Sequence, residues 1–172
     1  RRRKRKVRPL YDEQFGMSML WSEQASIQDF IGIVLDHING TLSLDLATGK
    51  FELGLIRDDY DPEDLAILSP SNILEMRSFQ RSSWGDTANE ITVIYTGRNE
   101  QELSVTVQDP ASIEAQGGVI PATREYRGIR DDNLAIRLAM RDLNTSSSNL
   151  AKVSLVCNRV AWNWNIGKVF SL

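Results

Sequence analysis

Two residue types that often carry catalysis occur once each in this sequence. His37 is the only histidine and Cys157 the only cysteine. A single cysteine excludes an intrachain disulfide and a zinc site built from several thiolates, and a single histidine excludes a His-rich metal centre. Catalysis by His37 would need a nucleophile or substrate pocket beside it, and the sequence contains no Gly-x-Ser-x-Gly motif. We therefore expect His37 to be structural or solvent-facing and Cys157 to be a small buried hydrophobic residue.

An acidic loop over residues 58–64 is the one cluster that resembles a cation site. Its carboxylates could bind calcium, because hard cations prefer several oxygen ligands, and they belong to Asp58, Asp59, Asp61, Glu63 and Asp64. The spacing is not that of an EF-hand, and no glycine stands at the bend. We favour a solvated loop that forms a salt bridge with Arg57 or with a neighbouring subunit. A Gly-rich phosphate-binding loop is absent from the sequence. We predict no catalytic residue, cofactor or metal, and hence no enzyme.

Three tryptophans are the candidate interface residues. Trp162 and Trp164 lie two residues apart, so a strand would put both rings on one face. Such a pair can stack on sugar rings, or it can fill a core or a subunit interface, where tryptophan is enriched. Trp84 lies in a predicted loop and is typical of an interface anchor. We predict an interface role for Trp84, Trp162 and Trp164.

The charge is distributed unevenly along the chain. Seven of the 20 basic residues lie within the first eight positions, which leaves 13 basic against 23 acidic residues in the remainder. A basic arm can bind nucleic acid or an acidic surface, but a flexible end or linker explains it equally. The acidic body argues against DNA binding by the folded part, because phosphate contacts need clustered Lys and Arg.

The N-terminal half predicts a helix followed by a hairpin. Residues 1–20 read as irregular. Ser26 and Asp29 resemble a capping box, apolar residues then recur at helical spacing up to Ile38, and Asn39-Gly40 ends the helix. Leucines alternate with polar residues over 42–46, and apolar residues alternate again over 51–55, around a turn at 48–49. Each strand should therefore have one buried face.

The C-terminal half predicts more strands and a second helix. Strands are expected at 73–79, 90–97, 101–108, about 123–129, and 153–157, with a short helical turn from Asp109 to Gly117 between the third and fourth. A well-buried helix is expected over about 133–143, followed by a polar loop at 145–149. Residues 162–172 read as a strand, a turn at Gly167, and a second strand. The order indicates an α+β protein, mainly antiparallel β, with two buried helices.

Short sequence pieces in a fixed order also resemble a known family. They are SIQDFI at 26–31, TGKFEL at 48–53, IRDDYD at 56–61, SNI at 71–73, NEITVIY at 89–95, LA at 134–135, RDL at 141–143, NRVAW at 158–162 and GKVF at 167–170. Over residues 26–172 the chain resembles the hub region of bacteriophage tail-tip proteins, the group that includes the phage lambda host-specificity protein and gene transfer agent hubs. Ile166-Gly167-Lys168 departs from the Pro-Gly-Asp usual at that turn.

The resemblance implies β-barrel-like hub domains that pack around a threefold axis and close the tail tube. It implies contacts with a distal tail protein and with the tape-measure protein, and DNA passing through the lumen without specific binding. The implied place is the tail tip of a virion assembled in the bacterial cytoplasm. Residues 21–172 would form the hub region, as two interleaved subdomains of about 21–60 plus 124–172 and 61–123, with 1–20 as a basic arm.

Two functions therefore stand as hypotheses. The first is a structural hub protein, most simply a homotrimer, without a membrane span because no apolar run approaches the length that a bilayer requires. The second is a carbohydrate-binding module for the host surface, with Trp162, Trp164 and Trp84 as platforms.

Overall fold

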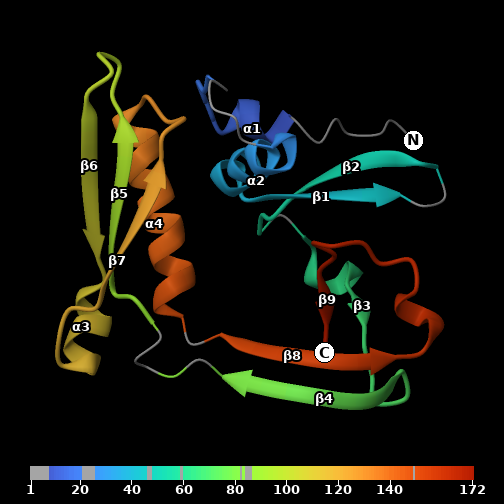
Figure 1. The fold of residues 1–172 in the computed structure, drawn as a ribbon. Coiled ribbons are helices and arrows are strands. Elements are labelled where there is room, and N and C mark those ends of the chain that lie inside the picture. The colour runs from blue at the N-terminus through green and yellow to red at the C-terminus, as the bar shows by residue number, and fades with distance from the viewer. Residues whose placement is uncertain are drawn as a thin grey trace. The chain divides into compact units, whose positions relative to one another are not determined.

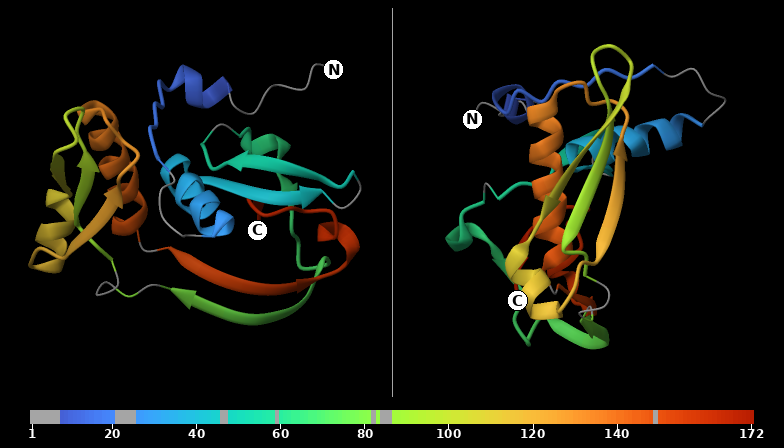
Figure 2. Two further views of the ribbon diagram at one scale, coloured as in Figure 1. Left: turned by 45° about the horizontal axis from the view of Figure 1, so that its top comes forward. Right: turned by 90° about the vertical axis from the view of Figure 1, so that its left-hand side faces the viewer.

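The chain forms two compact units. The computed structural model describes residues 8–20, 26–45, 48–58, 60–81, 83, 87–148 and 150–172. Unit 1 comprises Arg1–Glu13, Glu23–Phe79 and Val153–Leu172, and unit 2 comprises Gln14–Ser22 and Gln80–Lys152. The chain passes from unit 1 into unit 2 along strand β4 (Ile73–Arg81). It returns to unit 1 along β8 (Ala151–Cys157), the strand that pairs with β4. Figures 1 and 2 show the elements of both units.

Unit 1 is built from short elements and two-stranded sheets. Its helices are α1 (Arg8–Asp12), in a stretch predicted to be irregular, and α2 (Ile27–Ile38). The hairpin β1 (Gly40–Asp45) and β2 (Lys50–Leu55) is antiparallel, and β3 (Ala66–Ile67) pairs in parallel with β9 (Phe170–Ser171). β4 and β8 form the third pair, and their arrows run in opposite directions (Figure 1). Pro62–Asp64 and Arg159–Ala161 are single 3₁₀ turns.

Helix α2 begins where the sequence predicts it. The Ser26 side chain accepts a hydrogen bond from the Asp29 backbone N–H at 3.1 Å and donates one to the Asp29 carboxylate at 2.7 Å. These bonds satisfy donors that the first turn of a helix leaves open. The helix ends at Asn39, which takes the left-handed conformation (φ 49°) that we expected of Gly40. The prediction that α2 is well buried is wrong, because only His37 and Ile38 of its residues are buried.

The β1–β2 hairpin has the predicted register but not the predicted burial. Leu42 faces Leu53 and Leu44 faces Phe51, so the four apolar side chains share one face. We expected this face to be buried, yet Leu42 is 36%, Leu44 46% and Phe51 75% exposed. Helix α2 contacts β1. The chain thus leaves the more apolar face of this hairpin open.

The C-terminal segment corrects another prediction. Trp162 closes the 3₁₀ turn Arg159–Ala161 with helical dihedral angles, so residues 162–164 do not form the expected strand. Asn158 caps this turn by accepting a hydrogen bond from the Val160 N–H at 3.0 Å, and such local bonds compete with strand pairing. The turn at Gly167 (φ 86°) is confirmed.

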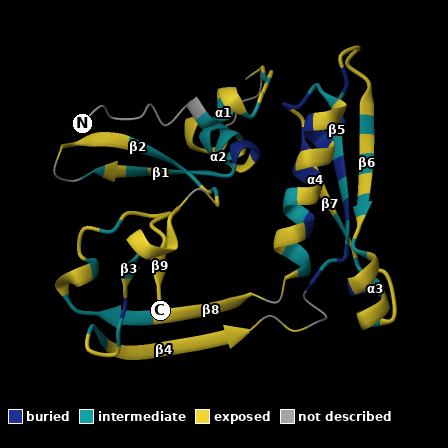
Figure 3. Ribbon diagram, turned by 180° about the vertical axis from the view of Figure 1, so that it is seen from behind, coloured by how far each residue is buried: buried dark blue, intermediate teal, exposed yellow. Residues whose placement is uncertain are grey.

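Unit 2 is a three-stranded sheet with two helices. Its order is β6 (Glu102–Gln108), β5 (Glu90–Thr96), β7 (Pro121–Tyr126); β5 and β6 are antiparallel, whereas β5 and β7 are parallel. The short helix α3 (Pro110–Gln116) connects β6 to β7, and α4 (Asp132–Ser147) contacts β5 and β6. Figure 3 shows the buried residues of β5 and α4 in dark blue.

A continuous apolar core lies between α4 and the sheet. Its members are Ile91, Val93, Tyr95, Tyr126, Ile129, Leu134, Ala135, Leu138, Ala139 and Leu143, with half-buried residues of β6 around them. The alternation predicted from the sequence is confirmed here: Ile91, Val93 and Tyr95 face the helix. Phe15 also packs against this core, and the Ser18 N–H donates to the Gly128 carbonyl at 2.8 Å. The segment 14–20 therefore belongs to this fold.

Buried polar groups fix the loops of unit 2. Asn89 is fully buried, and its side chain donates to the Gly118 carbonyl at 2.9 Å and accepts from the Ile120 N–H at 2.7 Å. Gly117 ends α3 in the left-handed region (φ 73°), as predicted. These bonds satisfy backbone groups that would be costly to bury unpaired.

Helix α4 is longer than predicted. Asp131 caps it by accepting from the Leu134 N–H at 3.1 Å, but the helix continues to Ser147 through the expected loop. Thr145 donates to the Arg141 carbonyl at 3.1 Å and Ser148 to the Asn144 carbonyl at 2.7 Å. These hydroxyl groups bond to the helix itself, so a Ser/Thr-rich stretch remains helical.

The α+β class is confirmed, with mostly antiparallel pairing. The β-barrel-like closure implied by the resemblance is not found in the described part of the chain, where the largest sheet has three strands. The predicted subdomain limits near 60 and 124 also differ from the two units, since β7 and α4 lie in unit 2. None of the described helices is long and apolar enough to cross a bilayer.

Candidate assembly surfaces

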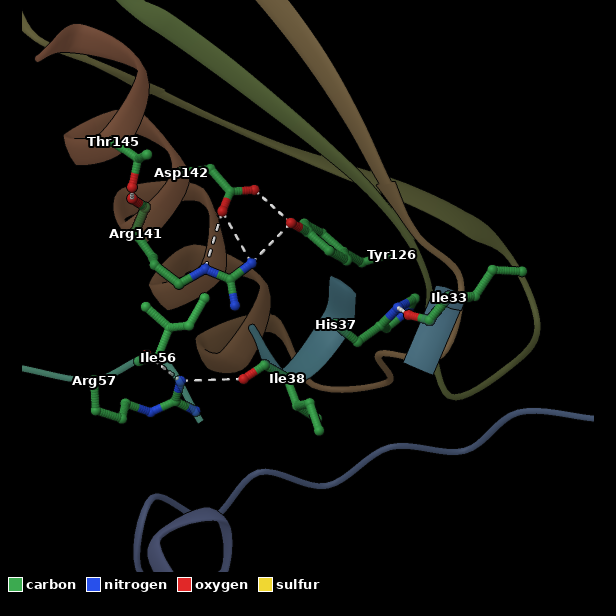
Figure 4. Close-up of polar contacts among 9 residues, drawn as sticks. All are labelled: Ile33, His37, Ile38, Ile56, Arg57, Tyr126, Arg141, Asp142 and Thr145. Carbon is green, nitrogen blue, oxygen red and sulfur yellow. Dashed lines mark hydrogen bonds and ion pairs between the residues drawn. The ribbon is translucent and has the colours of Figure 1, made fainter. Parts of the chain in front are cut away.

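The two residues with catalytic chemistry have structural surroundings. His37 is 2% exposed, and its Nδ1 lies 2.8 Å from the Ile33 carbonyl one turn earlier in α2 (Figure 4). Of the two predicted alternatives, structural or solvent-facing, burial excludes the solvent-facing one. Cys157 is half-buried at the end of β8 rather than fully buried.

The acidic loop folds upon itself. Asp61 accepts a hydrogen bond from the Glu63 N–H at 3.0 Å and so caps the 3₁₀ turn Pro62–Asp64. Asp59 lies outside the described residues. Among those that are described, no group of three or more His, Cys, Asp or Glu side chains is arranged to hold a metal ion.

Arg57 joins three segments of unit 1. Its guanidinium binds both carboxylate oxygens of Glu13, at 2.7 and 3.0 Å. It also donates to the carbonyls of Ile38, at 3.1 Å, and Ile56, at 2.8 Å (Figure 4). Arg57 thus pairs with Glu13 rather than with a described residue of the acidic loop, and the salt bridge predicted between that loop and a neighbouring subunit stays a prediction. A two-pronged pair of this kind fixes direction as well as distance, so Arg57 holds the segment after α1 against the end of α2.

Trp162 and Trp164, the two tryptophans that the structure describes, do not form one platform. Trp162 is 85% exposed, whereas Trp164 is half-buried and stacks on Phe170 with ring centroids 5.3 Å apart. The shared strand face predicted for the pair is wrong because residues 162–164 are not a strand. Trp84 lies outside the described residues, so its interface role stays a prediction.

Unit 1 leaves many of its large apolar side chains exposed. Among its described residues only His37, Ile38 and Leu68 are buried. Large exposed hydrophobic residues lie on the β1–β2 hairpin, on β3, on β4 and in the C-terminal segment, and include Leu42, Leu44, Phe51, Ile67, Leu74, Met76, Val160, Trp162, Ile166 and Leu172. Single exposed apolar residues are ordinary, but contiguous ones mark interaction surfaces.

Most residues of the β4–β8 ribbon are exposed. Every residue of β4 after Ile73 is exposed (yellow in Figure 3), and Leu74 is 69% and Met76 58% exposed. Asn158 fastens one end, since its N–H donates to the Asn72 carbonyl at 2.9 Å and its side chain to the Asn72 side chain at 3.2 Å. An isolated two-stranded ribbon is marginally stable in water, so a strand of this length needs further contacts.

Unit 2 presents the opposite kind of surface. The sheet face turned away from α4 carries polar side chains, and Thr92 and Thr106 form a hydrogen bond across it at 2.9 Å. Glu90 and Gln108 form a second cross-strand bond on the same face. A polar outer face over an apolar inner one is typical of an antiparallel sheet exposed to solvent.

A polar network closes one side of the core of unit 2. The Tyr126 hydroxyl donates to Asp142 and accepts from the Arg141 guanidinium at 2.8 Å (Figure 4). Arg141 also donates to the Asp142 carboxylate at 3.0 Å. Burial, and then the neighbouring Asp142 carboxylate, raise the pKa of Tyr126 well above its usual range. The phenol therefore stays protonated and structural at neutral pH.

Sequence reasoning missed the surfaces that the structure leaves open. It assigned the apolar residues of 42–55 to buried faces, made no prediction about the burial of 73–79, and reserved the interface for tryptophans. The signal that could have found β4 is the placement of Glu75 and Arg77 between Ile73 and Phe79 on one face of the strand, which fits neither a buried strand nor a half-buried one.

Comparison with known proteins identifies the family. A search of the curated proteins found no match. A protein-family model with the description "Putative phage tail protein" matches residues 26–172, which include nearly all of the elements described above. Since this match extends over most of the sequence, the chain belongs to that family of phage tail proteins.

Proposed function

We propose that the chain is a structural component of the hub that closes the tail tube at the tip of a phage tail. The observation that carries the proposal is the exposed apolar face of the β1–β2 hairpin, on which Phe51 is 75% exposed. An exposed apolar face of this kind marks an interaction surface, and tail proteins function as assemblies. The C-terminal segment, with Trp162, would supply a second contact.

The proposed partners are other copies of the chain and the neighbouring tail proteins. Three copies would surround the tail axis and contact a distal tail protein and the end of the tape-measure protein. The finished hub would lie in the virion, after assembly in the bacterial cytoplasm. Beyond the first eight residues, the chain contains 13 basic and 23 acidic residues. This negative body would repel DNA phosphates and let the genome pass through the lumen without binding.

The role is proposed as structural rather than catalytic. His37 is bonded to its own helix, and within the described residues no cluster of metal-binding side chains occurs. For the carbohydrate-binding alternative, Trp162 remains available as an exposed ring. Trp164 stacks on Phe170 and does not lie beside Trp162 as a second platform. Titration with host-surface glycans tests this alternative. If the native chain binds and the Trp162→Ala variant keeps its fold but does not bind, the carbohydrate-binding function is preferred to the hub function.

The hub proposal is tested by the substitution Phe51→Glu. A charge on the hairpin face should leave the isolated chain folded, because that face is exposed, but should exclude it from particles when the variant replaces the native protein in the phage. Ser104→Glu, on the exposed polar face of β6, is the matched control and should assemble normally. Infectious particles that contain Phe51→Glu at native amounts would refute the role of this face. Native mass spectrometry of assembled hubs tests the threefold count.

A further inference from the structure

The outer edge of β4 is a second open surface, different in kind from the hairpin face. Among the described strands β4 pairs with β8 alone, and its other edge has no described strand beside it. It is also the longest strand described, nine residues from Ile73 to Arg81. The backbone N–H and C=O groups of such an edge can pair with another strand.

We infer that this edge of β4 pairs antiparallel with β4 of a second copy of the chain, about a twofold axis through Met76. In this register Met76 faces the partner copy's Met76, and residues equally distant on either side face one another. Glu75 then faces Arg77 of the other copy, and Arg77 faces its Glu75. The two β4–β8 ribbons become one four-stranded sheet of order β8-β4-β4-β8.

The charge pattern selects this register. Pairing centred on Glu75 would oppose two carboxylates, and pairing centred on Arg77 would oppose two guanidiniums, which destabilises a cross-strand pair. Only the register centred on Met76 puts Glu75 opposite Arg77 in both halves. It also brings Ile73 opposite Phe79, so the flanking pair is apolar.

The side chains concerned are placed for such a contact. Within one chain Glu75 and Arg77 already lie on the same side of β4, with Arg77 Nε 3.7 Å from Glu75 Oε2 and side chains 61% and 65% exposed. An exposed pair of this kind contributes little by itself. In the paired sheet the same two residues would join their counterparts as a group of four alternating charges.

The pairing goes beyond the proposed hub. A twofold axis relates its two halves, so the contact is isologous and is complete with two copies. It uses the edge of β4, whereas the hub contact uses the face of the β1–β2 hairpin. Failure of either proposal therefore leaves the other standing, and the two are read out separately.

The first test uses charge reversal in the full chain. Glu75→Arg and Arg77→Glu each turn both opposed pairs into like-charge pairs, so each should raise the dimer Kd about tenfold or more in sedimentation experiments. The double variant Glu75→Arg/Arg77→Glu restores both pairs and should dimerise like the native chain. A mixture of the two single variants should also dimerise. One variant then carries two positive charges at positions 75 and 77 and the other two negative charges, so every opposed pair in the mixed dimer is of opposite sign.

The mixture doubles as the folding control, since misfolded single variants could not recover by mixing. A native chain that stays monomeric over the concentration series would overturn the proposal. So would a mass that does not change with either charge reversal, including a trimeric mass.

The second test locates the axis. In a Cys157→Ser background, Met76→Cys would place two thiols opposite one another, where antiparallel Cα atoms lie about 4.5–5.5 Å apart and a disulfide can form. Oxidation should give a covalent dimer. Ser78→Cys is the matched control, because its counterpart lies four residues along the partner strand and out of reach. Equal cross-linking at both positions would contradict the register.

Discussion

Strands β1 and β6 have almost the same alternating pattern but opposite surroundings. In β6 the apolar residues Leu103 and Val105 lie on the side of α4, and Ser104 between them is exposed. In β1 the apolar residues Leu42 and Leu44 are exposed, and the intervening Ser43 is half-buried. Alternation therefore shows that a strand has an apolar face, but it does not show what covers that face. In unit 2 the cover is a helix of the same chain, and in unit 1 we propose that it is another protein.

The largest difference between the units should appear on deleting core atoms of unit 2. Leu138 is 3% exposed within the core cluster, so Leu138→Ala should lower the free energy of unfolding of unit 2 by about 2–5 kcal/mol. Amide hydrogen exchange in α4 and β5 would measure this loss. Ile136→Ala, on the same helix but 37% exposed, is the control and should change exchange far less. Equal effects would mean that the two sides of α4 do not differ as described.

In unit 1 the side chain whose removal should cost most stability is a polar one, Arg57. Arg57→Ala removes four hydrogen bonds that hold the segment after α1, and we expect a local loss of about 1–2 kcal/mol. The Glu13 amide donates to the Pro9 carbonyl at 2.8 Å, and its exchange should accelerate while exchange in β5 stays constant. Arg57→Lys keeps the charge but cannot bind both carboxylate oxygens in the same way, so it should restore only part of the protection. Slow exchange of the Glu13 amide in the alanine variant would contradict this role.

The polar network of unit 2 predicts a dependence on alkaline pH. Because the pKa of Tyr126 is raised in the folded chain above its ordinary value of 10.0, the folded state keeps its proton where the unfolded state loses it. The stability from this group is complete below pH 10 and falls as pH rises further. Tyr126→Phe should cost about 1 kcal/mol at neutral pH and should flatten the alkaline fall.

Denaturation of unit 2 between about pH 8 and 11 would measure this effect. Tyr11→Phe, at a site where the side chain is 84% exposed, is the control and should retain the native profile. An unchanged alkaline fall in Tyr126→Phe would show that other groups cause it.

The smallest effect is expected on the hairpin. Leu44→Ser should change the free energy of unfolding of the isolated chain by less than about 0.5 kcal/mol, since 46% of the side chain is already exposed. The same change should impair incorporation into tails. A large destabilisation in the isolated chain would mean that the hairpin face is covered from within, and the contrast between the units would disappear.

Local signals predicted the elements well. Ser26 and Asp109 each marked the start of a helix, and the strands of unit 2 and of the β1–β2 hairpin lie within a few residues of their predicted bounds. The family also followed from short pieces in order, and the match over 26–172 confirms a phage tail protein, while the hub stays a proposal.

The predictions that were wrong concern contacts that no local sequence pattern specifies. Trp162 and Trp164 alternate as in a strand, but Asn158 caps a 3₁₀ turn ahead of them instead. Thr145 reads as a loop residue, but its hydroxyl bonds to the Arg141 carbonyl inside α4. Phe51 has the spacing of a core residue and lies exposed, because burial depends on a covering partner that the sequence of one chain does not specify.

The pairing of β4 with β8 has a consequence for how this protein can vary. The chain departs for unit 2 and returns from it along adjacent strands, so the two ends of residues 80–152 enter and leave side by side. A domain inserted in this way can be exchanged for another of different sequence, provided that its ends lie one strand spacing apart. Because residues 14–20 also pack with this fold, such an exchange would have to replace that segment together with 80–152, while the β4–β8 pair could stay as it is.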